Sequence, residues 1–431
     1  MEELPAILGG KPIRPEGPPI WPISDSAIRS AFATASESTS WGVYNGPMLR
    51  QLSQEIKEYF QIPFVIFCAS GTLAIETVLK SCGVNHESEV ILAGYEYEPS
   101  LLSILNLGAK PVLLDVYENC PVLDTSHLES AITEKTKAIL VSHLHGGIAA
   151  MPELNLIAAR HKIPVIEDAA QAMGGSLENK KLGTWGDYGI LSFGGSKLMS
   201  SGRGGAIFCK DQRLFQRLNL LLSRGIQQLA PLSELQAIVL IPQLQQLGIR
   251  HQQRARSVQR LCQKIVNFPG FRTIDYSHVL SKDTFVERNI SLSTDQNYPI
   301  DNRAVPSFQN QETINQTIDP GYYKCGFYFD DKTFGLSRSL FIRALRAEGF
   351  AFDSGFRSLF SGRSPKRYLA PFPMPQAIQT ESKMIILHHP ILLETSAFED
   401  EILHAIKKIY ALREEIAKRA NSSEEPEDNF K

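Results

Sequence analysis

One lysine lies in an unusual setting. Lys197 occurs in LSFGGSKLMSSGRGGAIF, residues 191–208, where glycines and serines separate two apolar runs. The ordinary interpretation is a solvated loop lysine, because ammonium groups are seldom buried. A lysine desolvated beyond the end of a strand would instead have a lowered pKa and could form a Schiff base with a carbonyl compound. Other polar residues of the chain must decide between these alternatives.

A carboxylate ends another strongly apolar run. VIEDAAQA, residues 165–172, places Asp168 at the end of a predicted strand, where an unpaired carboxylate is costly. Asp168 could simply cap the following helix. Alternatively, it could pair with a protonated ring nitrogen, with Gln171 one turn later forming a hydrogen bond to the same ligand.

Two further segments offer ligands for an anion. CASGTLA, residues 68–74, follows an apolar run and opens a predicted helix, so the amides of Gly71 and Thr72 and the Thr72 hydroxyl could hold a phosphate. Ser70 or Thr72 could instead be a simple N-cap. Ser192, just before Lys197, adds a hydroxyl after the same kind of run.

Two histidines follow another predicted strand. SHLHGG, residues 142–147, brings His143 and His145 to the same edge, where we expect them to line a substrate pocket. Their spacing could also suggest a metal, but no third ligand nearby and no C-x-x-C pair supports one. The sequence therefore predicts no metal site.

Apolar runs alternate with helical patterns between residues 60 and 210, which is typical of an α/β domain with a mostly parallel, seven-stranded sheet flanked by helices. The seven runs are FVIFCAS, EVILAG, KPVLLDV, KAILVSHL, IPVIED, YGILSF and GGAIFCK. Ligands bind beyond the carboxyl ends of the strands in such sheets, so the polar residues above should meet. A phosphate cradle, a buried aspartate and a Schiff-base lysine are what pyridoxal phosphate requires, and Tyr97 in AGYEYEPS could stack on its ring.

The rest of the chain predicts a second, smaller α+β unit. Residues 230–262 read as a long helix that Pro242 should kink. CGFYFDD suggests a strand, SRSLFIRALRAEGF a helix capped by Ser337, and residues 396–418 a last helix. We expect a large domain with an N-terminal arm over residues 1–255, a small domain over 256–420 and a flexible acidic tail over 421–431. Asp124 is expected to be an ordinary helix cap.

Charge and cysteine usage exclude several classes of protein. The 431 residues carry 44 basic and 46 acidic side chains without a basic block, which argues against nucleic acid or an anionic membrane as partner. No run approaches the length of a membrane span, and the acidic N-terminus does not resemble a secretory signal. The six scattered cysteines predict reduced thiols and a cytoplasmic location.

The order of these motifs resembles a known family. SGTLA, IEDAAQA, GDYGILSFGGSK and GRGGAIF are similar to segments of the DegT/StrS-type sugar aminotransferases, which are pyridoxal-phosphate enzymes of fold type I. The resemblance implies that Lys197 binds the cofactor aldehyde and that Asp168 pairs with the pyridine nitrogen. It also places Gln171 near the cofactor hydroxyl, Tyr97 on the ring face, and Gly71, Thr72 and Ser192 on the phosphate.

The opening AILGGKPIRP and the later FDSGFRSLF are most similar to the branch with aminocyclitol aminotransferases and 3-amino-5-hydroxybenzoate synthase. Within the resemblance, a homodimer with its active sites near the interface is implied. Two positions depart from the family pattern. Leu229 stands where an asparagine usually reaches the phosphate of the neighbouring subunit, which leaves Arg224 as the favoured replacement donor. His145 stands where a tyrosine is usual.

These observations predict an aminotransferase that moves an amino group from glutamate or glutamine to a keto-sugar or keto-cyclitol, with Lys197 as the base that moves the proton. A pyridoxal-phosphate lyase or an aromatase-like synthase is an alternative, since the same cofactor supports many reactions. A non-catalytic descendant that acts as a sensor is another. The presence of Lys197 argues against the related dehydratases, which carry histidine at this position.

Overall fold

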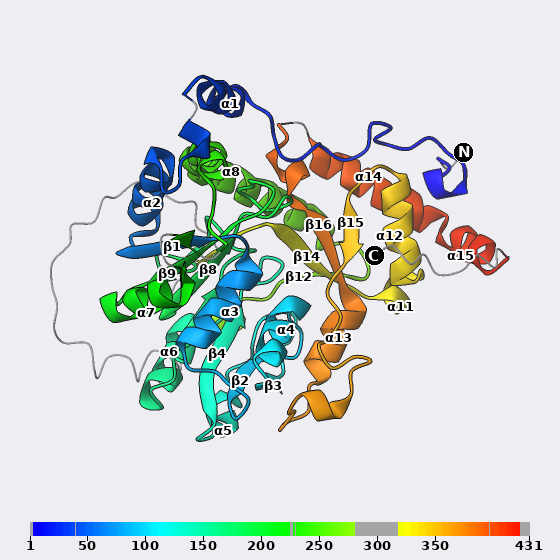
Figure 1. The fold of residues 1–431 in the computed structure, drawn as a ribbon. Coiled ribbons are helices and arrows are strands. Elements are labelled where there is room, and N and C mark those ends of the chain that lie inside the picture. Colours follow the sequence, from blue (N-terminus) through cyan, green and yellow to red (C-terminus); the bar gives the residue numbers. More distant parts are fainter. Residues whose placement is uncertain are drawn as a thin grey trace.

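A seven-stranded sheet forms the centre of the larger part of the molecule (Figure 1). The computed structural model describes residues 3–38, 40–224, 227–228, 230–280, 318–395 and 397–422. The strands are β1 (Phe64–Cys68), β2 (Glu89–Ala93), β3 (Lys110–Leu114), β4 (Thr136–Ser142), β5 (Val165–Asp168), β8 (Tyr188–Ser192) and β9 (Gly205–Cys209), in the order β1-β9-β8-β5-β4-β2-β3. These are the seven apolar runs of the sequence.

Most of these strands run in parallel. The pairs β2/β3, β2/β4, β4/β5 and β5/β8 are parallel, whereas β9 is antiparallel to both β1 and β8. The helices of this part are α2 (Pro47–Phe60), α3 (Gly71–Ser81), α4 (Glu98–Asn106), α5 (Leu128–Ala131), α6 (Met151–Arg160) and α7 (Gln212–Leu222). Figure 1 shows helices on both faces of the sheet, so the predicted α/β class with a mostly parallel, flanked sheet is confirmed.

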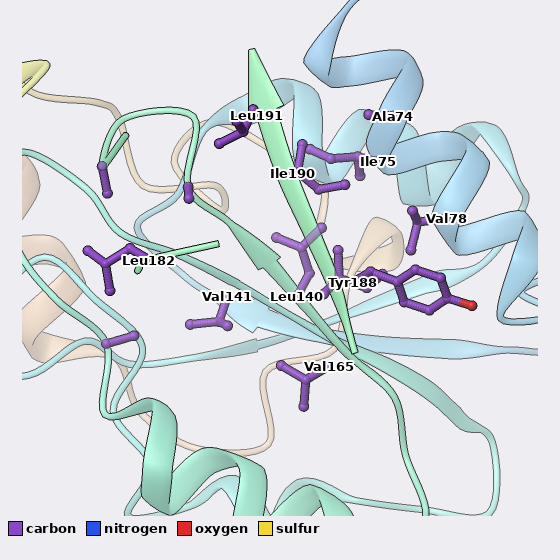
Figure 2. Close-up of a cluster of buried hydrophobic side chains, with 14 of the residues drawn as sticks. Ala74, Ile75, Val78, Leu140, Val141, Val165, Leu182, Tyr188, Ile190 and Leu191 are labelled. Carbon is purple, nitrogen blue, oxygen red and sulfur yellow. The ribbon is translucent and has the colours of Figure 1, made fainter. Parts of the chain in front are cut away.

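Helix α3 covers one face of the sheet through an apolar stripe. Ala74, Ile75 and Val78 face the sheet beside Tyr188 and Ile190 of β8 (Figure 2), and all five are buried. The spacing of the three helical residues places them on one face, and each large apolar side chain buried in this way contributes about 1.5–3 kcal/mol. The N-terminus of α3 is thereby held at one edge of the sheet.

One long helix, α8 (Glu234–Ile265), extends into the C-terminal part. It begins at Glu234 rather than at residue 230, because Ser233 and Gln236 form a capping box. Pro242 lies within it. The predicted domain division at residue 255 falls inside this helix and stays a prediction. The flexible acidic tail predicted over 421–431 also stays a prediction, since residues 423–431 lie outside the described part of the chain.

The C-terminal part contains a second, antiparallel sheet in the order β12-β14-β16-β15. Its strands are β12 (Phe271–Thr273), β14 (Lys324–Phe329), β15 (Phe352–Ser354) and β16 (Met384–His388). Its helices are α9 (Ser277–Leu280), α11 (Asp331–Phe334), α12 (Arg338–Ala347), α13 (Pro375–Lys383), α14 (Phe398–Ala411) and α15 (Arg413–Ser422). The predicted strand and the helix capped by Ser337 are confirmed as β14 and α12. The predicted last helix is divided into α14 and α15 at Leu412.

An N-terminal arm crosses both parts. It carries the short helix η1 (Ala6–Leu8) and helix α1 (Ser26–Ser38), followed by η2 (Ser40–Gly42). Buried Glu348 accepts backbone hydrogen bonds from Ala6 at 2.8 Å and Ile13 at 3.1 Å. The arm is therefore fixed to the C-terminal part, and Figure 1 shows it running along that side of the molecule.

The remaining short elements are β6 (Ser176–Leu177), β7 (Lys180–Lys181), β10 (Ser223–Arg224), β11 (Gln227–Gln228), β13 (Ile318–Asp319), η4 (Pro365–Arg367) and η5 (His389–Leu393). One expectation from the sequence is wrong. Asp124 does not cap a helix, because it accepts a hydrogen bond from the backbone of Ser126 in a turn and the N-cap position of α5 is held by His127.

Candidate active site

The strand register brings the predicted site residues to one edge of the large sheet. Asp168 pairs with Ser142 on β4 and with Ile190 on β8, two residues before Ser192. Ser192 pairs in turn with Gly205 of β9, which also pairs with Cys68 at the end of β1. Four chain segments that carry polar residues therefore end side by side, as expected for a site at the carboxyl ends of the strands.

Lys197 lies half-buried in the loop after β8, with its Nζ 4.2 Å from the centroid of the Tyr323 ring. The pKa of Lys197 is lowered to about 8, mainly by burial; Asp168 raises it and the charge of Lys324 lowers it. The backbone carbonyl of Lys197 accepts a hydrogen bond from the indole nitrogen of Trp21 at 3.1 Å. The structure therefore holds an amine of reduced basicity in a loop tethered by the N-terminal arm.

Asp168 is buried, and its Oδ1 accepts the backbone N–H of Ala170 at 2.8 Å. Burial raises the pKa of Asp168, whereas this hydrogen bond and the ammonium of Lys197 act in the opposite direction. Gln171, also buried, accepts the backbone N–H of His145 through Oε1 at 3.3 Å. The side chains of Asp168 and Gln171 thus lie at the same edge as Lys197.

Glu167, which the sequence analysis missed, occupies the opposite face of β5. Its buried carboxylate accepts hydrogen bonds from Nε2 of His143 at 3.0 Å and from the backbone amides of Gly183, Trp185 and Gly186 at 2.6, 2.6 and 2.9 Å. Burial alone would raise the pKa of Glu167, but these donors hold it below its ordinary value. This network is a fixed support beneath the site.

His143 is part of that support. Its Nδ1 accepts the backbone N–H of Ala149 at 3.1 Å, so Nε2 carries the proton that it donates to Glu167. Both ring nitrogens are therefore used within the protein. The predicted contact of His143 with a substrate would have to use the ring carbons.

His145 is fully buried and contacts a different set of residues. Its Nε2 lies 3.1 Å from the hydroxyl of Tyr95, which accepts the backbone N–H of Phe356 at 2.7 Å. Burial lowers the pKa of His145 to about 3, with Lys324 and Lys197 acting in the same direction. Its Nδ1 has no hydrogen-bond partner among the described residues. His145 is thus a neutral imidazole with one free nitrogen, and its predicted role in the substrate pocket stays a prediction.

The predicted phosphate cradle lies at the start of α3, and its contact with a phosphate stays a prediction. Ser70 is the N-cap, because its Oγ accepts the backbone N–H of Leu73 at 3.0 Å, which leaves Thr72 without that task. A Cβ on Gly71 would lie 3.0 Å from Cβ of Ser192. The Ser192 side chain therefore lies close to the N-terminus of α3. A side chain at position 71 would crowd Ser192, and glycine avoids this because it has no Cβ.

Tyr97 is 42% exposed and is the N-cap residue before α4. Its ring centroid lies 5.7 Å from that of Phe356. Its backbone N–H donates to buried Glu96 at 2.7 Å, and burial raises the pKa of Glu96 to about 8. Burial and the charge of Asp168 raise the pKa of Tyr97, and its predicted stacking on the cofactor ring stays a prediction.

Two predicted site positions cannot be placed as side chains in the structure. Arg224 belongs to β10, but its side chain is not described, and Leu229 lies in a gap of the described chain. The phosphate contact proposed for Arg224 therefore stays a prediction. Within the described ranges, no group of three or more histidine, cysteine or acidic side chains is arranged to hold a metal ion.

The structure adds Tyr323 and Lys324 to the site from the C-terminal part. Tyr323 lies beneath the Lys197 amine, and Lys324 is close enough to influence Lys197 and His145. The sequence signal was the polar segment GYYK directly before the predicted strand CGFYFDD. It could not show that this strand faces the other sheet.

The comparisons with known proteins agree with this geometry. Residues 23–318 match the model of the DegT/DnrJ/EryC1/StrS aminotransferase family. The chain belongs to this family. The protein is therefore an aminotransferase, and this match confirms the resemblance inferred from the motifs around Lys197 and Asp168.

A curated relative covers nearly the whole aminotransferase. It is the L-glutamine:2-deoxy-scyllo-inosose aminotransferase of Streptomyces lividus, 28% identical over 95% of this chain and 98% of the relative. Among solved structures, 3-amino-5-hydroxybenzoic acid synthase is 23% identical over 93% of this chain and 99% of that one, with a TM-score of 0.73. A putative sugar aminotransferase of Streptococcus pneumoniae, solved in its PMP form, is 18% identical over 94% and 98%, with a TM-score of 0.70. These two structures support the fold.

Proposed function

We propose that this aminotransferase uses pyridoxal phosphate to transfer an amino group from L-glutamine or glutamate to the ketone of a cyclitol or a related sugar. The relative that covers the chain is named for L-glutamine and a keto-cyclitol. One observation carries the proposal: the Lys197 amine and the Asp168 carboxylate interact at the carboxyl edge of the sheet. Burial is the main reason that the pKa of this amine is lowered to about 8.

The residues at this edge fit the cofactor. Lys197 would bind its aldehyde carbon, and Asp168 its pyridine nitrogen. The open space that a Cβ on Gly71 would fill lies against Ser192 at the N-terminus of α3, where a phosphate is stabilised by backbone amides. Gln171 would reach the cofactor hydroxyl, and Tyr97 would cover the ring.

Each side chain has a defined chemical task. Bound pyridoxal phosphate supplies an electron sink that stabilises negative charge on the substrate carbon. Asp168 holds a proton on the ring nitrogen through a charge-assisted hydrogen bond. Because burial lowers the pKa of Lys197 to about 8, a useful fraction of its Nζ is neutral near that pH and can accept the proton from the donor α-carbon. The Glu167–His143 network keeps β5, and with it Asp168, in place.

We further propose a cytoplasmic homodimer with active sites near the subunit interface, as the family resemblance implies. All six cysteines are free thiols, which fits a reducing compartment. In the part of the chain that the structure describes, no helix combines the length and the apolar character needed to cross a membrane.

The decisive experiment follows both halves of the reaction. The protein loaded with pyridoxal phosphate is mixed with L-glutamine, and conversion of the cofactor to its amino form is followed by absorbance. Keto-cyclitols and keto-sugars are then screened for return of the aldehyde form. We expect transfer by the wild type and none by Lys197→Ala. A loaded wild-type protein that accepts an amino group from no amino acid would overturn the proposal.

A further inference from the structure

Two lysine amines lie near the ring of Tyr323. Its centroid is 4.2 Å from Nζ of Lys197 and 5.7 Å from Nζ of Lys324. The ring is held in place because its hydroxyl forms a hydrogen bond with Ser196 Oγ at 2.7 Å and the backbone N–H of Tyr323 donates to the carbonyl of Gln171 at 3.3 Å. Lys324 is therefore a second amine at the site, presented by the first residue of β14.

Lys324 has no ion pair of its own within the described ranges. The acidic residue with the strongest influence on it is Asp353, whose carboxylate already lies 2.6 Å from Arg346 and 3.6 Å from His388. Burial lowers the pKa of Lys324, and the ammonium in turn lowers the pKa of Lys197. The Lys324 ammonium therefore lies close enough to influence the Lys197 amine and has no described carboxylate paired with it, so an anionic group bound there would meet a positive charge.

We propose that Lys324 binds the α-carboxylate of the amino-acid donor. This inference rests on the proposed function. The α-carboxylate and the amino group are bonded to the same carbon, so the carboxylate must lie next to the place where Lys197 and the donor amine exchange. A keto-cyclitol carries no such charge, and the cofactor phosphate has its own proposed place at the start of α3. An ammonium–carboxylate hydrogen bond is among the stronger polar contacts in proteins.

Nearby arginines are less suited to this task. Arg254 is fully buried behind Trp21 and His389, which leaves a ligand no access to its guanidinium. Arg338 donates to the carbonyls of Glu381 and Met384 and is used within the fold. Lys324 differs from Arg254 because it is only half-buried, and from Arg338, which is also half-buried, because no described residue forms an ion pair with its ammonium.

The test compares L-glutamine with 4-aminobutanamide, which is the same molecule without its α-carboxylate. The half-reaction is measured for the wild type, Lys324→Met, Lys324→Arg and a control, Lys332→Met, which removes the same charge from an exposed position on α11. For Lys324→Met we expect kcat/KM for L-glutamine to fall about 10- to 100-fold, with little change for 4-aminobutanamide. Lys324→Arg should recover part of the loss, and Lys332→Met should behave as wild type.

Two further readouts do not depend on turnover. Glutaramate, which is glutamine without its amino group, should bind the loaded wild type more tightly than Lys324→Met in calorimetry. In the apo protein, competitive acetylation of Lys197 should show its pKa raised in Lys324→Met, because a neighbouring positive charge has been removed. Circular dichroism and cofactor affinity should match those of the wild type.

The outcomes separate the possible failures. Three results would overturn the carboxylate assignment while leaving the proposed function intact. They are equal losses of kcat/KM for both amines, unchanged glutaramate binding, and a loss of cofactor affinity as large as the loss for L-glutamine. A loaded wild type that reacts with no amino acid would instead overturn the proposed function itself.

Discussion

Nε2 of His143 donates a hydrogen bond to the buried carboxylate of Glu167 at 3.0 Å, one residue before Asp168 on β5. Three backbone amides of the segment 183–186 bind the same carboxylate. Glu167, for which the sequence predicted no role, thus connects the ends of β4 and β5 with the loop 183–186. Its removal should reveal how much of the site depends on this support.

Glu167→Gln should destabilise the protein by about 3–5 kcal/mol, because an amide offers one acceptor oxygen and places an N–H against groups that already donate. Thermal unfolding measures the loss. Glu129→Gln is the matched control, since Glu129 also lies 3.0 Å from a histidine, His161, but on the surface. It should change stability by less than about 1 kcal/mol. Equal effects of the two substitutions would contradict the structural role of Glu167.

The same carboxylate predicts a pH dependence. The pKa of Glu167 is lower in the folded protein than its ordinary value of 4.5. Its contribution to stability is therefore fully present above pH 4.5 and is lost as the pH falls through the native-state pKa. Unfolding free energies of the wild type should fall faster with acidification in this range than those of Glu167→Gln. Parallel pH curves for the two proteins would count against this assignment.

Asp168→Asn should leave partial cofactor binding but reduce transamination by orders of magnitude, because a neutral amide cannot hold the ring nitrogen protonated. Rates of the half-reaction and cofactor affinity are measured together. Asp124→Asn is the control, since the Asp124 carboxylate accepts the backbone N–H of Ser126 in a turn and is not one of the residues assigned to the cofactor. An equal rate loss in the control would show that the assay reports stability rather than chemistry.

Gly71→Ala should weaken pyridoxal-phosphate binding about tenfold or more. The new Cβ would lie 3.0 Å from Cβ of Ser192, so that side chain must move away from the phosphate position. Gly248→Ala is the matched helical control, because no atom lies within 4 Å of its added Cβ. The control should keep cofactor affinity and stabilise α8 by up to about 1 kcal/mol. Unaltered pyridoxal-phosphate affinity in Gly71→Ala would show that the start of α3 does not bind the cofactor phosphate.

Arg224→Ala should weaken pyridoxal-phosphate binding more than it lowers the melting temperature of the apo protein, if its guanidinium replaces the family asparagine at the Leu229 position. Gln228→Ala provides the comparison, because glutamine is the other nearby donor in sequence. Cofactor titration and apo melting curves give both quantities. Wild-type affinity in Arg224→Ala would leave the phosphate to Gly71, Thr72 and Ser192.

The central sheet was predictable because its signals are local. Each strand is a short apolar run, and parallel strands buried on both faces need no partner to be recognised in sequence. Lys197, Asp168 and Ser192 follow such runs, so the rule for strand ends placed them at one edge before any contact was known. The helix capped by Ser337 was equally local, because its cap and its stop lie within the segment.

The contacts between distant segments were not predictable. Trp21 reaches the carbonyl of Lys197 across 176 positions of the chain, and Tyr323 and Lys324 come from a different sheet. No periodicity encodes such a meeting, since it depends on how the N-terminal arm and β14 pack against the large sheet. His143 was assigned to substrate for the same reason. Only the folded chain shows that Glu167 and Ala149 bind both of its ring nitrogens.

The most direct test of the account is to locate the cofactor on the chain. The loaded protein is reduced with borohydride, digested and mapped by mass spectrometry. We expect the loaded protein to be yellow, reduction to fix the pyridoxyl group to Lys197, and no cofactor to be fixed in Lys197→Ala. A pyridoxyl group mapped to Lys324 or to any other lysine, or normal turnover by Lys197→Ala, would contradict the account.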